Sequence, residues 1–362
     1  MGRISRILLF SALPAVRRFF YFDALLYGIL SIVPLILLIN RSLTIRNVWI
    51  GSFLLAICVG YAAYWDPMRY LKYMPLAFFI IVYRAADIER LGNIKYSHFV
   101  LFFLAASSLS VYQNYFEFFP WDIAFLQSGV GSIGEEGYLS HQDIRPMSFF
   151  SGLAEATLFF LFAMVIFALK RNYFLCFLAL IFALMSGSRG VLISFILGLF
   201  VSFVSSRKSS SVNSVIMRSF FVGVMAYLAI VIAAPLLSIL QGEFGASRLA
   251  FWGSMGARIN YLIDFFATFS WLNILNPVLL EQQIYDNILL TMINDFGVVL
   301  ALLLLFCIYR GLYISGYWGH IFMSTLIIYG FFADQVLSIY LLAIFWVGTA
   351  IVKRYSLVNR KI

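Results

Sequence analysis

The sequence predicts an all-α, polytopic integral membrane protein with about 10 to 12 transmembrane helices and a large outer loop that contains an amphipathic helix. Of its 362 residues, 63% are hydrophobic and only 11% are charged. A water-soluble domain of this size cannot bury so much apolar surface. Apolar runs near the length of roughly 20 residues that crosses a bilayer recur from end to end. They predict a single transmembrane domain over 1–362, with long connections at 113–148 and 241–286.

The apolar runs alternate with short polar connections. Two runs, near the N-terminus and at 74–83, are short enough to lie in the membrane interface instead of crossing it. The clear candidate spans are residues 20–39, 47–65, 97–113, 149–169, 173–188, 190–206, 219–240, 288–309, 318–333 and 336–352.

Basic residues predict the orientation of the helices. Lys170 and Arg171, Arg207 and Lys208, and Arg310 fall at every second connection, which places these connections in the cytoplasm. The two long connections then face outward. The net charge of +9 is spread over short loops in the manner of a membrane protein, so no nucleic-acid partner is expected.

The stretch "SGSRG" places an arginine between two apolar runs. Residues 173–206 as one helix would be about 51 Å long, against a hydrocarbon core of roughly 30 Å. We therefore expect two helices joined by an outward turn over 186–190, with Arg189 at the outer membrane boundary. There its guanidinium could reach lipid head groups, or it could bind a phosphate together with the N–H groups that open the next helix.

Three more arginines lie on the outer connections, at Arg145, Arg248 and Arg258. A guanidinium can bind two phosphate oxygens at once, which lysine cannot do, although a single arginine is more often simply solvated or lipid-facing. Together with Arg189 they form a candidate anion site.

Apolar residues at spacings of three and four follow Arg248 and predict an amphipathic helix on or in the membrane interface. Most of its side chains are expected to pack or to anchor the loop. Three aromatic residues could instead stack on a sugar ring: Trp252, Tyr261 and Trp271.

From about Arg145 to its end, the chain resembles the O-antigen polymerase and O-antigen ligase group of membrane glycosyltransferases. The motifs are "RPMSFFSG", "SGSRG", "SRLAFW" and "YDNILLTMINDFG". In ligases of this group, the last motif typically carries a His, then Asn, nine residues and a Gly. Here Asn287 and Gly297 keep this spacing, but Asp286 stands in place of the His. This replacement favours an O-antigen polymerase.

The resemblance implies a multi-pass protein of the bacterial inner membrane whose active site faces the periplasm. The enzyme would join undecaprenyl-pyrophosphate-linked oligosaccharide repeats and release undecaprenyl pyrophosphate, in lipopolysaccharide biosynthesis. Its partners would be that substrate, membrane lipid, and a chain-length regulator and a flippase of the same pathway. Two alternatives stay open: an O-antigen ligase that transfers glycan to lipid A core, and a lipid-linked oligosaccharide flippase or other transporter. Against a transporter, the sequence has no detectable repeat.

The resemblance also implies roles for the candidate residues. The arginines would bind the substrate pyrophosphate. Asp286 is the first candidate for the general base, with Glu155 and Asp143 as alternatives, and Asn287 and Ser188 would orient the acceptor. An acid at Asp286 could equally favour or cap the helix that begins near Asn287, and Glu155 could pair with an arginine.

No metal or cofactor is expected. The sequence has no DxD motif, and its three histidines are scattered at His98, His141 and His320. We therefore expect metal-independent glycosyl transfer.

Overall fold

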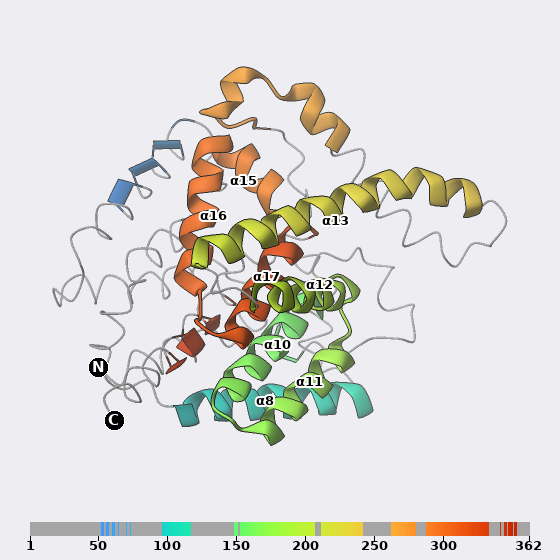
Figure 1. Cartoon of the computed structure of the whole chain (residues 1–362), viewed down its shortest axis with the longest axis vertical. Helices are drawn as coiled ribbons and strands as arrows, with labels where there is room; N and C mark the ends of the chain where they lie inside the picture. The colour runs from blue at the N-terminus through green and yellow to red at the C-terminus, as the bar shows by residue number, and fades with distance from the viewer. Residues whose placement is uncertain are drawn as a thin grey trace. The chain divides into compact units, whose positions relative to one another are not determined.

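The computed structural model describes residues 96–116, 148–150, 153–206, 211–241, 262–279 and 287–332, with scattered positions within 52–73 and 341–352. All regular structure in these residues is helical, without a strand, which confirms the all-α class (Figure 1). The helices are α8 (Tyr96–Tyr115), α10 (Leu153–Leu169), α11 (Tyr173–Ser186), α12 (Arg189–Ser206), α13 (Val212–Gln241), α15 (Ile288–Phe296), α16 (Val298–Leu312) and α17 (Tyr317–Gly330), with a 3-10 helix η2 (Trp271–Ile274) and a short helical stretch at 262–268.

Within the described residues, one helical segment, Val212–Ala229 of α13, is long and apolar enough to cross a membrane by length and composition. Four described apolar helices are shorter: Leu153–Leu169, Tyr173–Ser186, Gly190–Val204 and Val298–Leu312. The expected spans at 20–39, 47–65 and 336–352, and the short run at 74–83, lie wholly or largely outside the described residues.

Two expected boundaries are wrong. The apolar run at 288–309 is not one helix, because Gly297 separates α15 from α16 with φ 78° and ψ 169°, a backbone region that is essentially reserved for glycine. The "SGSRG" turn is also shorter than expected. Only Gly187 and Ser188 lie between α11 and α12, since Gly187 adopts the left-handed conformation that ends α11 at once.

The chain divides into two compact units. Unit 1 comprises Met1–Leu192, Gly311–Phe322 and Ser338–Ile362, and unit 2 comprises Ile193–Arg310 and Met323–Leu337. The division falls inside α12, α16 and α17, so each of these helices contributes residues to both units.

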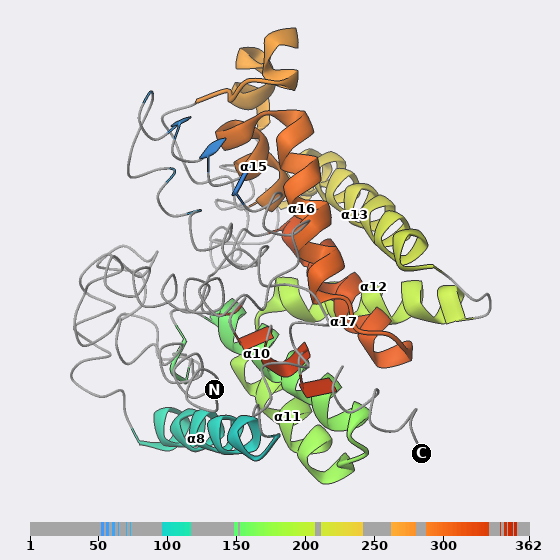
Figure 2. The ribbon, with the colours of Figure 1, turned by 90° about the vertical axis from the view of Figure 1, so that its left-hand side faces the viewer.

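The core of unit 1 forms around α10, which is buried on all sides from Glu155 to Ala168. Phenylalanine rings pack around it: the ring centroids of Phe103 and Phe167 are 4.8 Å apart, and those of Phe162 and Phe345 are 4.7 Å apart. Figure 2 shows α8, α10 and α11 beside one another. A helix that is apolar all round is therefore enclosed by its neighbours.

In unit 2, small residues bring α13 against the end of α17. Ser219 Oγ donates to the carbonyl of Val215 at 2.7 Å and lies 2.9 Å from Ser324 Oγ. The rings of Phe220 and Phe331 have centroids 5.1 Å apart. These hydroxyls are fully buried and bonded, so they cost little in an apolar surrounding.

Candidate active site

The turn that precedes Arg189 is fixed at both sides. The Gly187 N–H donates to Ala183 O at 3.1 Å and closes α11, while Ser188 O accepts from Leu192 N at 3.0 Å and opens α12. Arg189 is thus the first residue of α12, and its side chain lies outside the described part of the chain.

The same turn is bound to α10 across 31 residues of sequence. Ser188 N–H donates to Thr157 Oγ1 at 3.2 Å, and Thr157 Oγ1 donates to Leu153 O at 2.7 Å. The hydrogen bond uses one of the N–H groups near the start of α12, and it involves the backbone of Ser188 and not its hydroxyl group. Thr157, which the sequence interpretation missed, is the residue that positions the arginine-bearing turn.

Two further polar side chains lie close to this contact in sequence. Glu155, two residues before Thr157, is in the first turn of α10 and is 5% exposed. Ser186, two residues before Ser188, is fully buried, and its Oγ has no hydrogen-bond partner. Glu155 is therefore a buried carboxyl group in the same turn of α10 that carries Thr157, although residues two apart do not share a helix face.

A second anchor precedes α10. Gln113 Oε1 accepts from Ser148 N at 2.7 Å, Gln113 Nε2 donates to Ser148 O at 3.1 Å, and Ser148 Oγ donates to Ala106 O at 2.7 Å. Ser148 is fully buried and has φ 56°, a conformation that non-glycine residues rarely adopt. The segment that follows Arg145 by three residues is thus held against α8.

In unit 2, the last motif folds into α15, and Asn287 is its N-cap. Asn287 Oδ1 accepts from the N–H groups of Leu289 at 3.0 Å and Leu290 at 3.2 Å, while Nδ2 donates to Phe331 O at 3.1 Å. The side chain is 2% exposed. Asn287, and not Asp286, therefore holds the capping position of this helix.

Gly297 is the matching residue at the other end. A Cβ at Gly297 would lie 2.9 Å from Asn276 O, 3.0 Å from Leu275 C and 3.1 Å from Asn273 O, all backbone atoms. Close by, Val278 N and Leu279 N donate to Asn294 O at 3.1 and 3.2 Å. The nine residues between Asn287 and Gly297 are those of α15, so the motif spacing is a helix length between two fixed ends.

The helix α15 also carries a carboxyl group that the sequence interpretation missed. Asp295 is 2% exposed, and Thr291 and Asn287 lie four and eight residues before it, which places all three on one side of α15. The available signal was an acid inside an apolar run, which is costly within a membrane and usually functional.

The other sequence-predicted site residues lie outside the described residues: Asp143, Arg145, Arg248, Arg258 and Asp286, with Trp252 and Tyr261. Trp271 is described and is 86% exposed. Among the described residues, no three His, Cys, Asp or Glu side chains gather to form a metal site.

In comparisons with known proteins, no protein-family model, curated protein or solved structure matches this chain.

Proposed function

We propose that this chain is an O-antigen polymerase, a multi-pass glycosyltransferase of the bacterial inner membrane that acts at the periplasmic face. The observation that carries the proposal is the last motif. Its Asn, nine residues and Gly coincide with the N-cap, the body and the end of α15, whose two ends are fixed by hydrogen bonds and close backbone packing. A spacing shared with ligases of the same group thus has a physical reason in this chain, and Asp286 in place of their His favours the polymerase.

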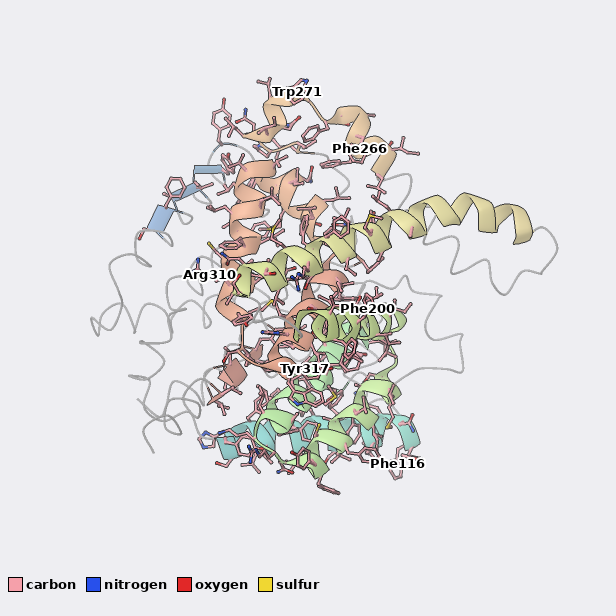
Figure 3. The ribbon with its side chains drawn as sticks, viewed as in Figure 1. Phe116, Phe200, Phe266, Trp271, Arg310 and Tyr317 are labelled. Carbon is pink, nitrogen blue, oxygen red and sulfur yellow. The ribbon has the colours of Figure 1, made fainter. Side chains whose placement is uncertain are left out.

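Exposed apolar stripes support the membrane placement. On α12, Ile193, Ile196 and Phe200 are each about half exposed or more, and Met217 and Phe221 on α13 are exposed to a similar extent (Figure 3). They recur at spacings of three and four, so each forms a stripe along one helix face. Soluble monomers rarely expose continuous apolar surface of this kind, whereas lipid tails would cover it.

The proposed reaction moves a glycan between two lipid carriers. A hydroxyl oxygen of the acceptor sugar attacks the anomeric carbon of the growing chain, and the bond from that carbon to the pyrophosphate oxygen breaks. Undecaprenyl pyrophosphate leaves with the bonding electron pair, and a carboxylate takes the hydroxyl proton. Because negative charge develops on the leaving oxygen, guanidinium groups held nearby would stabilise it.

Four arginines would bind the pyrophosphate: Arg145, Arg189, Arg248 and Arg258. The packing around two of them supports this role. Arg189 opens a helix fixed by Thr157, and Arg145 precedes a segment fixed by Gln113. Asp286 remains the preferred base, with Glu155 and Asp143 as alternatives. Glu155 is buried in the first turn of α10, where an ionisable group is costly in an apolar surrounding, and this supports a functional role for it.

The test is a ladder assay. Purified protein in detergent is incubated with its undecaprenyl-pyrophosphate-linked repeat, and products are separated by length. A ladder of polymers is expected. Transfer of a single glycan to added lipid A core, without a ladder, would instead indicate a ligase, and translocation across vesicles without either product would indicate a transporter.

A matched pair of variants links the ladder to the site. Arg189→Lys keeps the charge but loses the planar fork, so polymer formation should fall strongly at normal protein abundance. Arg310→Lys, in the last turn of α16 on the expected cytoplasmic side, should leave the ladder unchanged. Equal ladders from both variants would contradict the proposed pyrophosphate site.

A further inference from the structure

Residues 262–279, which precede α15, expose large apolar side chains in an unusual concentration. Five of them are between 60% and 86% exposed: Ile263, Phe266, Trp271, Leu272 and Leu275. By contrast, Phe265 is 2% exposed and is the ring that this segment buries. A patch of this kind on a protein surface usually marks a contact with another apolar partner.

Hydrogen bonds hold the patch outward. Asn273 Oδ1 accepts from Ser270 N at 2.7 Å and from Ser270 Oγ at 2.8 Å, and Asn273 Nδ2 donates to Pro277 O at 2.9 Å. These bonds close η2 from both sides. Trp271 projects from the segment away from α15 and α16 (Figure 3). The side chains are therefore presented by a fixed turn.

The position of η2 is set by Gly297, which packs on the backbone of Asn273, Leu275 and Asn276. Gly297 directly precedes α16, and the exposed apolar face of α16 begins with Val299 and continues with Leu302 and Leu303. If that face meets lipid tails, η2 lies at the depth where the tails end. Tryptophan is enriched at this depth in membrane proteins.

The charge of the segment indicates the kind of partner. Residues 262–279 contain a single charged side chain, Asp264, and no basic residue. Asp264 and Thr268 are exposed and lie four residues apart, on one side of the short helical stretch. Ile263 and Phe266 lie three residues apart, on another side. The contact must therefore come from apolar insertion, because attraction to an anionic partner has no cation here to act on.

We propose that residues 263–275 form a membrane-interface anchor that inserts Trp271, Leu272 and Leu275 into the outer leaflet of the bilayer. Through Gly297, the anchor holds the end of α15 near the lipid head groups, where the pyrophosphate of a lipid-linked substrate resides. Trp271 then serves as a lipid contact and not as a sugar-stacking residue. This inference rests on the proposed membrane placement but not on glycosyl transfer.

The test measures depth in the bilayer. In full-length protein lacking Cys58, Cys176 and Cys307, the single changes Trp271→Cys and Leu272→Cys are labelled with an environment-sensitive fluorophore and reconstituted in phosphatidylcholine vesicles. Asp264→Cys, an exposed polar position in the same segment, is the water-facing control. Leu303→Cys, on the exposed face of α16, is the lipid-facing control.

Probes at Trp271 and Leu272 should be quenched by lipids spin-labelled close to the head group, and iodide should quench them several-fold less than the probe at Asp264. Iodide quenching equal to that at Asp264 would overturn the anchor. Protection of the probes from iodide that disappears when the protein is diluted in the vesicles would indicate contact with a second copy and would also overturn the anchor. Protection that requires added polyprenyl phosphate would overturn it as well. If the Leu303 probe is itself not quenched by lipid, the membrane placement fails first.

Discussion

Replacing Gly297 by alanine should lower the free energy of unfolding, and the structure around α15 allows the size of this loss to be worked out. The backbone at Gly297 lies in the region that costs other residues about 1 to 3 kcal/mol. The new methyl group would also meet three backbone atoms at 2.9 to 3.1 Å, which cannot rotate away as a side chain could. Overpacking of this kind costs about 1 to 3 kcal/mol. The two terms give about 2 to 6 kcal/mol, a large share of a typical folding free energy of about 5 to 15 kcal/mol.

Gly316 provides the control, because it also has positive φ, at 101°, but no atom within 4 Å of an added Cβ. Gly316→Ala therefore incurs only the backbone cost, about 1 to 3 kcal/mol. The apparent Tm of each variant is measured in detergent by thiol-reactive dye or by loss of the monodisperse peak on heating. Gly297→Ala should lower the Tm more than Gly316→Ala does. Equal shifts would refute the close packing of η2 on Gly297.

Three further predictions concern the site and the topology. Asp286→Asn should reduce polymer formation by about 10² to 10⁴ without loss of folded protein, with partial recovery in Asp286→Glu; near-normal ladders would move the base to Glu155 or Asp143. Polymer formation in detergent should survive EDTA, and complete loss that Mg²⁺ restores would contradict metal-independent transfer. Burial lowers the pKa of Lys170, in the α10–α11 connection, to about 8, so acylation applied from the cytoplasmic side should reach half its maximum near pH 8. A midpoint near pH 10 or labelling only from outside would contradict that environment or orientation.

The sequence predicts helices well where an apolar run is bounded by polar or glycine residues. The expected spans at 173–188 and 190–206 correspond to α11 and α12, because Gly187 offers the left-handed conformation that stops one helix before the next. The break at Gly297 could not be predicted in this way. The mean hydropathy over 288–309 stays high despite Asn294 and Asp295, and the reason for the break is packing against backbone about twenty positions earlier.

Hydrogen bonds between distant residues were likewise beyond sequence analysis. Gln113 and Ser148 are 35 residues apart, and Thr157 and Ser188 are 31 apart. Neither pair matches a spacing that local structure would favour, since helical neighbours are three or four residues apart. The residue types were suggestive, because polar side chains in apolar helices need partners, but the partner of each could not be deduced.

The packing of Asn287 separates the two residues that the motif places side by side. An asparagine amide offers one oxygen with two lone pairs and two N–H donors. In Asn287, the oxygen accepts from two backbone N–H groups and one donor is used by Phe331 O, which leaves at most one hydrogen for a substrate or for Asp286. Removing this side chain would therefore destabilise α15 whatever its part in catalysis, so lost activity alone could not assign it a catalytic role. Asp286 carries no such ambiguity as a cap, because Asn287 already occupies that position. A change of rate at unchanged stability in Asp286 variants thus reports on chemistry, and this makes Asp286 the informative position of the pair.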